Sequence, residues 1–321
     1  MRAITPVGYV GAAGDVSTDY LGFDGEIIDK ETIHFYLVNQ RPPVDSEMKY
    51  IDATKIGTNS TIEVFEYKRG EDSMRHLRTV WSPDIYTPNN VAAIGGGAFV
   101  VTNDHTAGVT MVRTSALLSS HDQTHSWRQR KHLDPILGGG SIAYCDAKSA
   151  CHTATPGFKF RFPNGLARGT DGKIYLPSSI DGNIQVFSLL PDFTLKLDDV
   201  IHVGMPLDNL ARDANGDFWI PGFPDGLQLM NWAKTPLELH LSGTIWKITR
   251  TDSGHGDLSY KVDKVFEDAE SKIMNGVTTV RHDVKTGRLF LASKLSDHRE
   301  VSLRLLVLGV MKDLAFCEPT A

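Results

Sequence analysis

Four copies of one short pattern restrict the fold of this chain more than any other feature of its sequence. Each copy has an asparagine, a short run of small or apolar residues, a turn that contains glycine, and a second run rich in aromatic and β-branched residues. Such runs on either side of a glycine turn predict a β-hairpin. The copies are PNNVAAIGGGAFVVTND, PNGLARGTDGKIYLPSS, LDNLARDANGDFWIPGF and MNGVTTVRHDVKTGRLFLASK.

The spacing of these copies predicts an all-β fold, a six-bladed β-propeller with four-stranded antiparallel blades around a central channel. The gaps between copies vary too much for a solenoid but suit blades with loops of different length, at about 50 residues per blade. No linker divides the chain, so residues 1–321 are expected to form a single domain. A β-sandwich is the alternative, but it would not bring the four asparagines together. These are Asn89, Asn164, Asn209 and Asn275, followed by turn glycines Gly97, Gly172, Gly216 and Gly287.

Charge and hydropathy exclude several functions. The chain has 33 basic and 39 acidic residues, a net charge of −6, and no basic block that would follow a phosphate backbone. Nucleic acid is therefore not an expected partner. No run of 18 or more apolar residues occurs, and the first residues, MRAITPVGYVGAAGD, do not have the pattern of a secretory signal.

Two features bear on the cellular compartment, and each has two interpretations. Cys145 and Cys151 in YCDAKSAC form either a disulfide, which would indicate an oxidising compartment, or two reduced thiols that are near in sequence. Asn59 begins an NST sequon, which marks either a glycosylation site or a chance match. Together they point toward the secretory pathway without establishing it.

The repeated asparagines predict a cation site. An amide oxygen is a neutral, hard ligand, and Ca²⁺ binds such oxygens together with carboxylates. The alternative is that each asparagine caps its own turn. For proton transfer, His105 in TNDH is the best-placed histidine, because it directly follows the second strand of a hairpin. The expected ligands are Asn89, Asn164, Asp208 and Asn209, with Asn90 and Asn275 in support.

Several motifs in order resemble the paraoxonase/arylesterase family. They are FYLVNQRPP, STIEVFEY, LRTV, TPNNV, TNDH, PNGLA, LDNLARDANGDFW and LAFCE, while YCDAKSAC and KVDKVFED are similar to the fungal branch of that family. The resemblance implies a propeller with a catalytic Ca²⁺ in its channel, a second, structural Ca²⁺ beneath it, and hydrolysis of lactones or aryl esters. The catalytic-ion ligands of the family match Asn89, Asn164, Asp208 and Asn209 here.

The sequence also departs from the family. The family's Cys-Glu-Asp run, which carries one more ligand, would fall before Met1, so the first segment is expected to be missing, through loss or a late start of the gene model. The cysteine that pairs with Cys317 would be lost with it. Asn90 stands where the structural ion has a carboxylate, so that ion is expected to be absent. The run REVSLRLLVLGVMKD at 299–313 is expected to be an insertion before the final strand.

Three histidines of the family's site are replaced, by Asp24 in FDGE, Gln40 in NQRPP and Phe223 in PGFPDG. Only the one matching His105 remains. Glutamine is not a base near neutral pH, whereas Asp24 becomes one if burial raises its pKa.

Three functions stay open, all with a small-molecule ligand. The first is a calcium-dependent lactonase or esterase in which Asp24 or His105 activates water. The second is a non-hydrolytic enzyme of secondary metabolism that guides a cycloaddition or cyclisation, with Gln40, the asparagines, Phe223 and Trp219 orienting the substrate. The third is a catalytically silent binding propeller.

Overall fold

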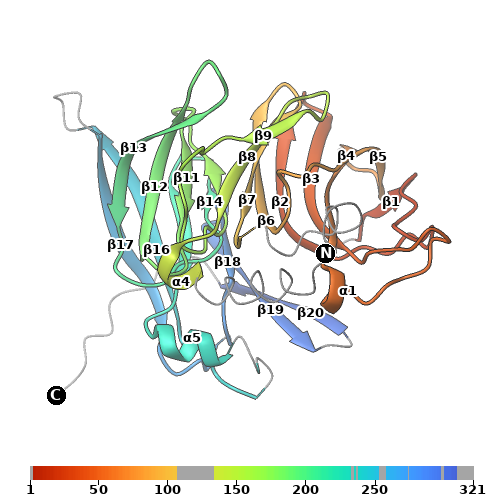
Figure 1. Cartoon of the computed structure of the whole chain (residues 1–321). Coiled ribbons are helices and arrows are strands. Elements are labelled where there is room, and N and C mark those ends of the chain that lie inside the picture. The colour runs from red at the N-terminus through yellow and green to blue at the C-terminus, as the bar shows by residue number, and fades with distance from the viewer. Residues whose placement is uncertain are drawn as a thin grey trace, which may run out of the picture. The chain divides into compact units, whose positions relative to one another are not determined.

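The computed structural model describes residues 3–106, 134–232, 235, 238–252, 258–273, 275–297 and 300–308. These residues form mainly β-strands, with three short helices (Figure 1). Within most sheets each strand pairs antiparallel with the next strand of the chain, as in the blades of a β-propeller. The predicted all-β propeller class is confirmed. No helix in the described part of the chain is long and apolar enough to cross a membrane.

The predicted number of six blades is wrong. The described residues form five sheets, of which four have at least four strands and the last has three. The estimate assumed about 50 residues per blade, but the first sheet alone extends from Thr5 to Val80. Residues 107–133, between two strands of the second sheet, lie outside the described residues. The chain therefore uses more residues per sheet than the value of about 50 on which the prediction of six blades was based.

Residue contacts divide the chain into two compact units, and each is described by itself. Unit 1 consists of residues 1–180 and 185–198, and unit 2 of residues 181–184 and 199–321. The expectation of a single domain over residues 1–321 stays a prediction.

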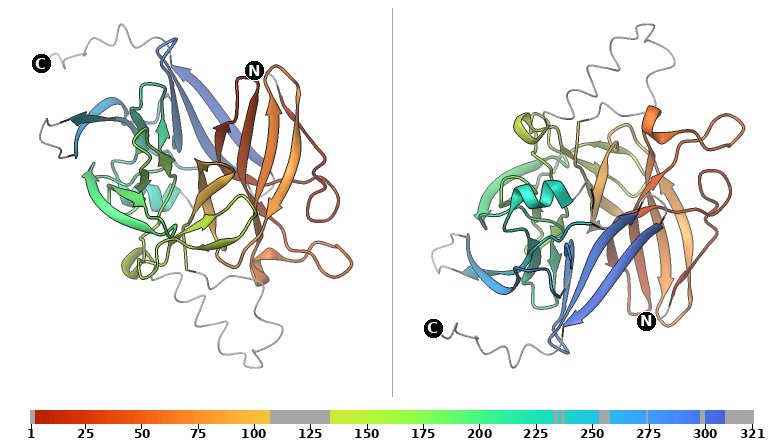
Figure 2. Two further views of the ribbon diagram at one scale, coloured as in Figure 1. Left: turned by 90° about the horizontal axis from the view of Figure 1, so that it is seen from above. Right: turned by 90° about the horizontal axis from the view of Figure 1, so that it is seen from below.

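The first sheet of unit 1 has five strands in the order β1-β5-β4-β3-β2. These strands, red to orange, lie side by side in Figure 2. The edge strand β1 pairs parallel with β5, whereas the other pairs are antiparallel. The elements are β1 Thr5–Val7, β2 Tyr20–Ile27, β3 Thr32–Arg41, α1 Ala53–Ile56, β4 Asn59–Lys68 and β5 Ser73–Val80.

The second sheet, in the order β6-β7-β8-β9, contains a disulfide, which decides between the two interpretations of the Cys145 and Cys151 pair. Cys145 and Cys151 are opposite residues of β8 and β9 and are bonded, with their Cα atoms 4.1 Å apart. Cys317 lies outside the described residues. The elements are β6 Pro88–Gly95, β7 Ala98–Asn103, α4 Asp134–Leu137, β8 Ser141–Cys145 and β9 Cys151–Thr153.

Most of the third sheet, β10 to β13, belongs to unit 1, which has two layers of apolar core. One cluster, including Tyr36, Ile62 and Phe99, packs the first sheet against the second. Another, including Val100 and Phe187, packs the second sheet against the third. The strands are β10 Ala167–Arg168, β11 Ile174–Pro177, β12 Asn183–Leu189 and β13 Leu195–His202.

Unit 2 contains the fourth and fifth sheets, packed through a cluster that includes Trp219, Val280 and Leu291. The run at 299–313 is not simply an insertion, because its residues 300–308 form β20 and pair antiparallel with β19. Alternating apolar residues in EVSLRLLVL favour such a strand. The elements are β14 Ala211–Arg212, β15 Phe218–Gly222, α5 Gly226–Trp232, β16 Gly243–Asp252, β17 Leu258–Asp268, β18 Thr279–Asp283, β19 Arg288–Asp297 and β20 Glu300–Leu308.

The four predicted turn glycines all have the left-handed backbone that glycine adopts without strain. Their φ angles are 84° at Gly97, 78° at Gly172, 89° at Gly216 and 67° at Gly287. Each glycine lies between the first two strands of one sheet. The predicted hairpins are therefore confirmed.

Candidate functional site

The predicted site residues fall in both units. Gln40, Asn89, His105 and Asn164 belong to unit 1 and are called the strand-end cluster below, and Asp24 also belongs to that unit. Unit 2 contains Asp208, Asn209, Trp219 and Phe223.

The loop that leads into β6 is held by the buried amide of Asn103, the last residue of β7. Its Oδ1 accepts the backbone N–H groups of Tyr86 and Thr87 at 2.9 and 3.2 Å. Its Nδ2 donates to the carbonyl of Asp84 at 2.8 Å. Sequence reasoning did not single out Asn103. These bonds fix the residues that immediately precede Asn89.

Asn89 lies at the start of β6 and is half-buried. Within the described residues its side chain makes no hydrogen bond, so its amide oxygen is available to a ligand. The backbone of β2 approaches closely here, since a Cβ on Gly22 would lie 2.5 Å from the carbonyl oxygen of Asn89. The next residue, Asn90, is buried, and its Oδ1 accepts the N–H of Val91 at 2.8 Å. Asn90 thus stabilises the strand.

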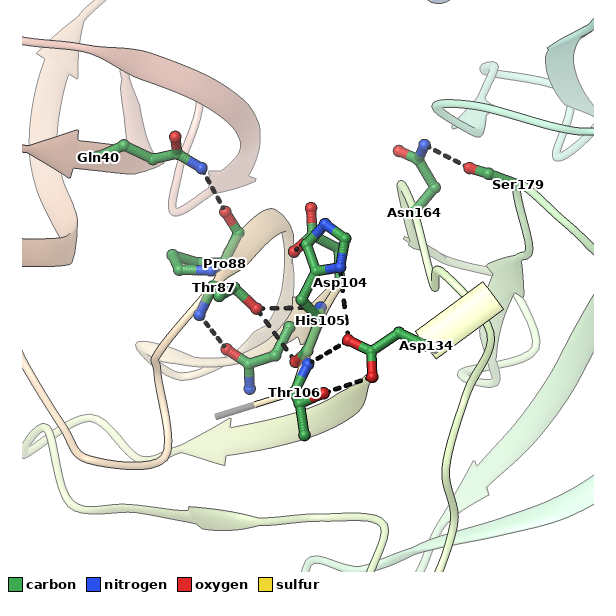
Figure 3. A network of polar contacts seen from close by, with 10 residues as sticks. Gln40, Thr87, Pro88, Asp104, His105, Thr106, Asp134, Asn164 and Ser179 are labelled. Carbon is green, nitrogen blue, oxygen red and sulfur yellow. Dashed lines mark hydrogen bonds and ion pairs between the residues drawn. The ribbon is translucent and has the colours of Figure 1, made fainter. Parts of the chain in front are cut away.

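His105 follows β7 and is fixed at both backbone and ring (Figure 3). Its N–H donates to Thr87 Oγ1 at 3.1 Å, and that hydroxyl donates to the carbonyl of His105 at 3.3 Å. Nδ1 lies 3.6 Å from a carboxylate oxygen of Asp134, and Nε2 lies 3.9 Å from one of Asp104. The ring packs edge-on against Phe162, with 4.5 Å between centroids.

Short contacts to neighbouring residues link the segments that carry the strand-end cluster. Gln40 donates from Nε2 to the carbonyl of Pro88 at 3.2 Å, directly before Asn89. His105 contacts Phe162, two residues before Asn164. Asn164 donates from Nδ2 to Ser179 Oγ at 2.8 Å, and its Oδ1 accepts the N–H of Gly165 at 2.8 Å (Figure 3). Unit 1 therefore brings these four predicted residues to one end of its sheets.

Asp24 is not part of this group. Its Oδ2 accepts the backbone N–H of Ala93 in β6 at 3.0 Å, which joins the first two sheets. Along β2, Tyr20 pairs with Asn39, the neighbour of Gln40, whereas Asp24 pairs with Tyr36. Four residues of strand correspond to roughly 13 Å. Asp24, the predicted base, is thus far from Gln40. The FDGE motif indicates that Asp24 lies in a strand, but it does not show how far along the strand Asp24 is from the end of the sheet where Gln40 lies.

In unit 2, Asp208 and Asn209 interact directly. Asn209 donates from Nδ2 to Asp208 Oδ1 at 2.8 Å and to the carbonyl of Thr278 at 3.0 Å. Both of these bonds use the amide nitrogen of Asn209. Asn275, at the equivalent position of the last hairpin, bonds through both amide atoms to the backbone of Leu239 and Leu241. Asn275 is therefore a structural residue.

Trp219 and Phe223 are each only 1% exposed, which does not support their prediction as substrate-binding residues. Trp219 packs with Ile245 and Val280, and Phe223 packs with Trp232 and Leu241. Large aromatic side chains occur both in apolar cores and at substrate-binding surfaces, and the sequence alone did not show which of these applies to Trp219 and Phe223.

A buried polar group in unit 2 was missed by sequence reasoning. Asp213 Oδ2 accepts Trp219 Nε1–H and contacts His282 Nδ1, both at 2.8 Å, while Oδ1 accepts the N–H groups of Asn215 and Asp217. Burial by itself raises the pKa of the Asp213 carboxyl, but the hydrogen bonds from His282, Trp219 and the backbone outweigh it and lower that pKa. The only sequence signal was an aspartate before the Asn-Gly turn of a hairpin.

The donor chemistry of the predicted ligands fits a hard cation, because every candidate atom is an amide or carboxylate oxygen. In the part of the chain that the structure describes, no three His, Cys, Asp or Glu side chains form a group that could hold a metal ion. Among the amide oxygens of the described residues, that of Asn89 is the clearest candidate ligand. The residues of the second, structural ion do not fit, since Asn90 is an uncharged amide at the position expected to supply that ion's carboxylate.

Comparison with known proteins supports the resemblance seen in the sequence. No family model matches the chain. It is similar to serum paraoxonase/arylesterase 1 of Mus musculus, with 28% identity over 174 residues, 54% of this chain and 44% of that protein. It is also similar to serum paraoxonase/lactonase 3 of Oryctolagus cuniculus, with 25% identity over 209 residues, 64% of this chain and 49% of that protein. The resemblance to the paraoxonase/arylesterase family is confirmed, and the fungal branch stays a prediction.

The chain spans about half the length of the curated relatives it matches. Two solved structures are similar over most of the chain at low scores. One is a luciferin-regenerating enzyme, with 13% identity, a TM-score of 0.45 and coverage of 97% of this chain and 96% of that one. The other is a gluconolactonase of Xanthomonas campestris, with 14% identity, a TM-score of 0.37 and coverage of 89% of this chain and 84% of that one. Scores of this size carry no conclusion about the function of this chain.

Proposed function

We propose that this chain is a calcium-dependent hydrolase that opens lactones or aryl esters. The observation that carries the proposal is its sequence similarity to curated relatives that are named arylesterases and lactonases. The strand-end cluster adds support, because it combines amide oxygens with a histidine whose ring is held by its neighbours. Metal-assisted ester hydrolysis can use both kinds of group, the amide oxygens to hold an ion and the histidine to take a proton from water.

In this proposal the amide oxygens of Asn89 and Asn164 are ligands for Ca²⁺. The ion, when bound, supplies a Lewis acid that polarises the substrate carbonyl. The sequence also predicts Asp208 and Asn209 as ligands, and that part stays a prediction. A single carboxylate among four ligands offsets little of the cost of dehydrating Ca²⁺, so we expect weak binding of the ion.

His105 is the proposed proton acceptor. Its Nε2 takes a proton from water as the water oxygen bonds to the carbonyl carbon. The carbon–oxygen bond of the lactone or ester then breaks, and the proton passes from His105 to the leaving oxygen. Gln40 cannot replace His105 as a base, and its amide, tied to the Pro88 carbonyl, helps to shape the site.

A non-hydrolytic enzyme is the second candidate, favoured by the distance of Asp24 from the cluster. In this proposal His105 and the amides orient a reactive polyketide or terpenoid for cycloaddition or cyclisation, which requires positioning but no water. A propeller that binds a small molecule without catalysis is the third.

Removal of calcium tests the hydrolase proposal. A chelator is expected to lower kcat/KM for phenyl acetate and for a γ-lactone by at least about 100-fold, because the loss of a Lewis acid removes several kcal/mol of transition-state stabilisation. Added Ca²⁺ should restore the activity. A folded protein that hydrolyses neither substrate, or hydrolyses both equally with the chelator present, contradicts the proposal. Incubation with unsaturated polyketide or terpenoid substrates then separates the second candidate from the third.

A further inference from the structure

We infer that Asp134 is a positioning residue for His105: it holds the imidazole in the tautomer with the proton on Nδ1, so that Nε2 presents a lone pair to water. This inference rests on the proposed function only where it assigns the base to His105. The orientation of the ring is a property of the resting protein.

The carboxylate of Asp134 is fixed and almost completely buried. Its side chain is 1% exposed, at the start of α4. Oδ2 accepts the backbone N–H of Thr106 at 2.9 Å, and Oδ1 accepts the hydroxyl of the same residue. Gly139 packs so closely against the carboxylate that a Cβ at that position would not fit. The Asp134 side chain therefore has little freedom to turn away.

The ring of His105 is fixed from the other side. Its backbone is tied to the Thr87 hydroxyl by two hydrogen bonds, and Phe162 packs edge-on against the imidazole. With both partners held, Nδ1 lies 3.6 Å from Asp134 Oδ2, which is within ion-pair range and longer than a hydrogen bond, so the carboxylate acts on the ring through its charge. Figure 3 shows this contact beside the two bonds from Thr106.

A buried carboxylate beside one ring nitrogen favours a proton on that nitrogen, since an N–H next to a negative oxygen is stabilised and a lone pair there is repelled. The other nitrogen, Nε2, then accepts a proton. Asp104 lies 3.9 Å from Nε2, but its side chain is 22% exposed and solvent weakens its effect. Both carboxylates lie within ion-pair range of the ring. Asp104 would stabilise the imidazolium once the proton has arrived.

Nitrogen NMR of the full-length protein tests the inference directly. With ¹⁵N-labelled histidine, and His105 assigned by its loss in His105→Gln, the neutral ring in the wild type is expected to give a protonated Nδ1 and an unprotonated Nε2. In Asp134→Asn the ring should lose this preference, because the amide can donate to Nδ1 as well as accept from it. Thr106→Val is the matched control, since it removes a bond to the carboxylate but keeps the charge, and the tautomer should not change.

Activity provides the second readout. Asp134→Asn is expected to lower kcat about 10- to 100-fold with KM within about threefold, and to have no further effect in the His105→Gln background. Additive losses would show that Asp134 does not act through His105. A wild-type ring protonated on Nε2 overturns the inference even if Asp134→Asn does not fold. If the wild type hydrolyses nothing, the proposed function fails, whereas the NMR result still decides the role of Asp134.

Discussion

Replacing His105 by glutamine is expected to lower kcat/KM for aryl-ester hydrolysis by about 100- to 10,000-fold, the range for loss of a general base. Glutamine keeps a polar group of similar size against Phe162 but cannot take a proton from water. Of the histidines in the described residues, only His105 lies in the strand-end cluster. Initial rates with phenyl acetate at saturating Ca²⁺ measure the effect, together with a thermal melt that shows the variant is folded.

His152→Gln is the matched control. His152 lies in β9, where its Nε2 contacts the backbone oxygen of Phe193 at 3.3 Å, and it takes no part in the cluster. Its replacement is expected to change kcat/KM by less than about twofold, as for a surface substitution away from the site. If His105→Gln also stays within twofold of the wild type, His105 is not the base and the hydrolytic mechanism proposed for it is wrong.

Replacing Asp213 by alanine is expected to lower the free energy of unfolding of the protein by about 3–5 kcal/mol, the cost of removing one partner of a buried charged group. The substitution leaves the indole N–H of Trp219, the ring of His282 and two backbone N–H groups without their acceptor. Denaturant unfolding followed by tryptophan fluorescence measures this loss, since Trp219 is buried beside the mutated residue. A loss below about 1 kcal/mol would contradict the structural role.

The stabilisation by Asp213 should depend on pH in a defined direction. Its carboxyl has a lowered pKa in the folded protein, against about 3.9 in an unfolded chain. The folded state therefore favours the ionised carboxylate. The contribution of this carboxylate to stability is complete above the pKa of the unfolded state and is lost as the pH falls through the pKa of the folded state. The difference in stability between the wild type and Asp213→Asn should shrink below about pH 4.

The sequence predicted the parts of the fold that depend on interactions between residues close together in the chain. The hairpins formed in the expected register because the turn glycines supply a left-handed backbone that other residues rarely adopt. The same register placed Asn89 and Asn164 at the ends of neighbouring sheets in unit 1. His105 was found because it directly follows a hairpin strand.

Features that depend on packing between distant segments were missed. Asp134 is far from His105 in the chain, and only the fold brings its carboxylate to the ring. Trp219 and Phe223 were assigned to substrate, although the sheets around them bury both. Asn275 shares the repeat position of Asn89, yet nearby backbone groups use both its amide atoms. The sequence repeat therefore predicts the backbone position of each asparagine. The neighbouring groups in the fold determine whether its side chain is free to bind a ligand or is used in the structure.

Calcium titration by calorimetry tests the central claim most directly, that an amide oxygen at the start of a sheet's first strand binds a cation. The wild type is expected to bind Ca²⁺, and Asn89→Leu, of similar size but without the oxygen, should weaken binding at least about tenfold. Asn275→Leu is the matched control, expected to bind Ca²⁺ like the wild type while unfolding more easily. A wild type that binds no Ca²⁺, or an Asn89→Leu variant that binds it equally well, would contradict the claim.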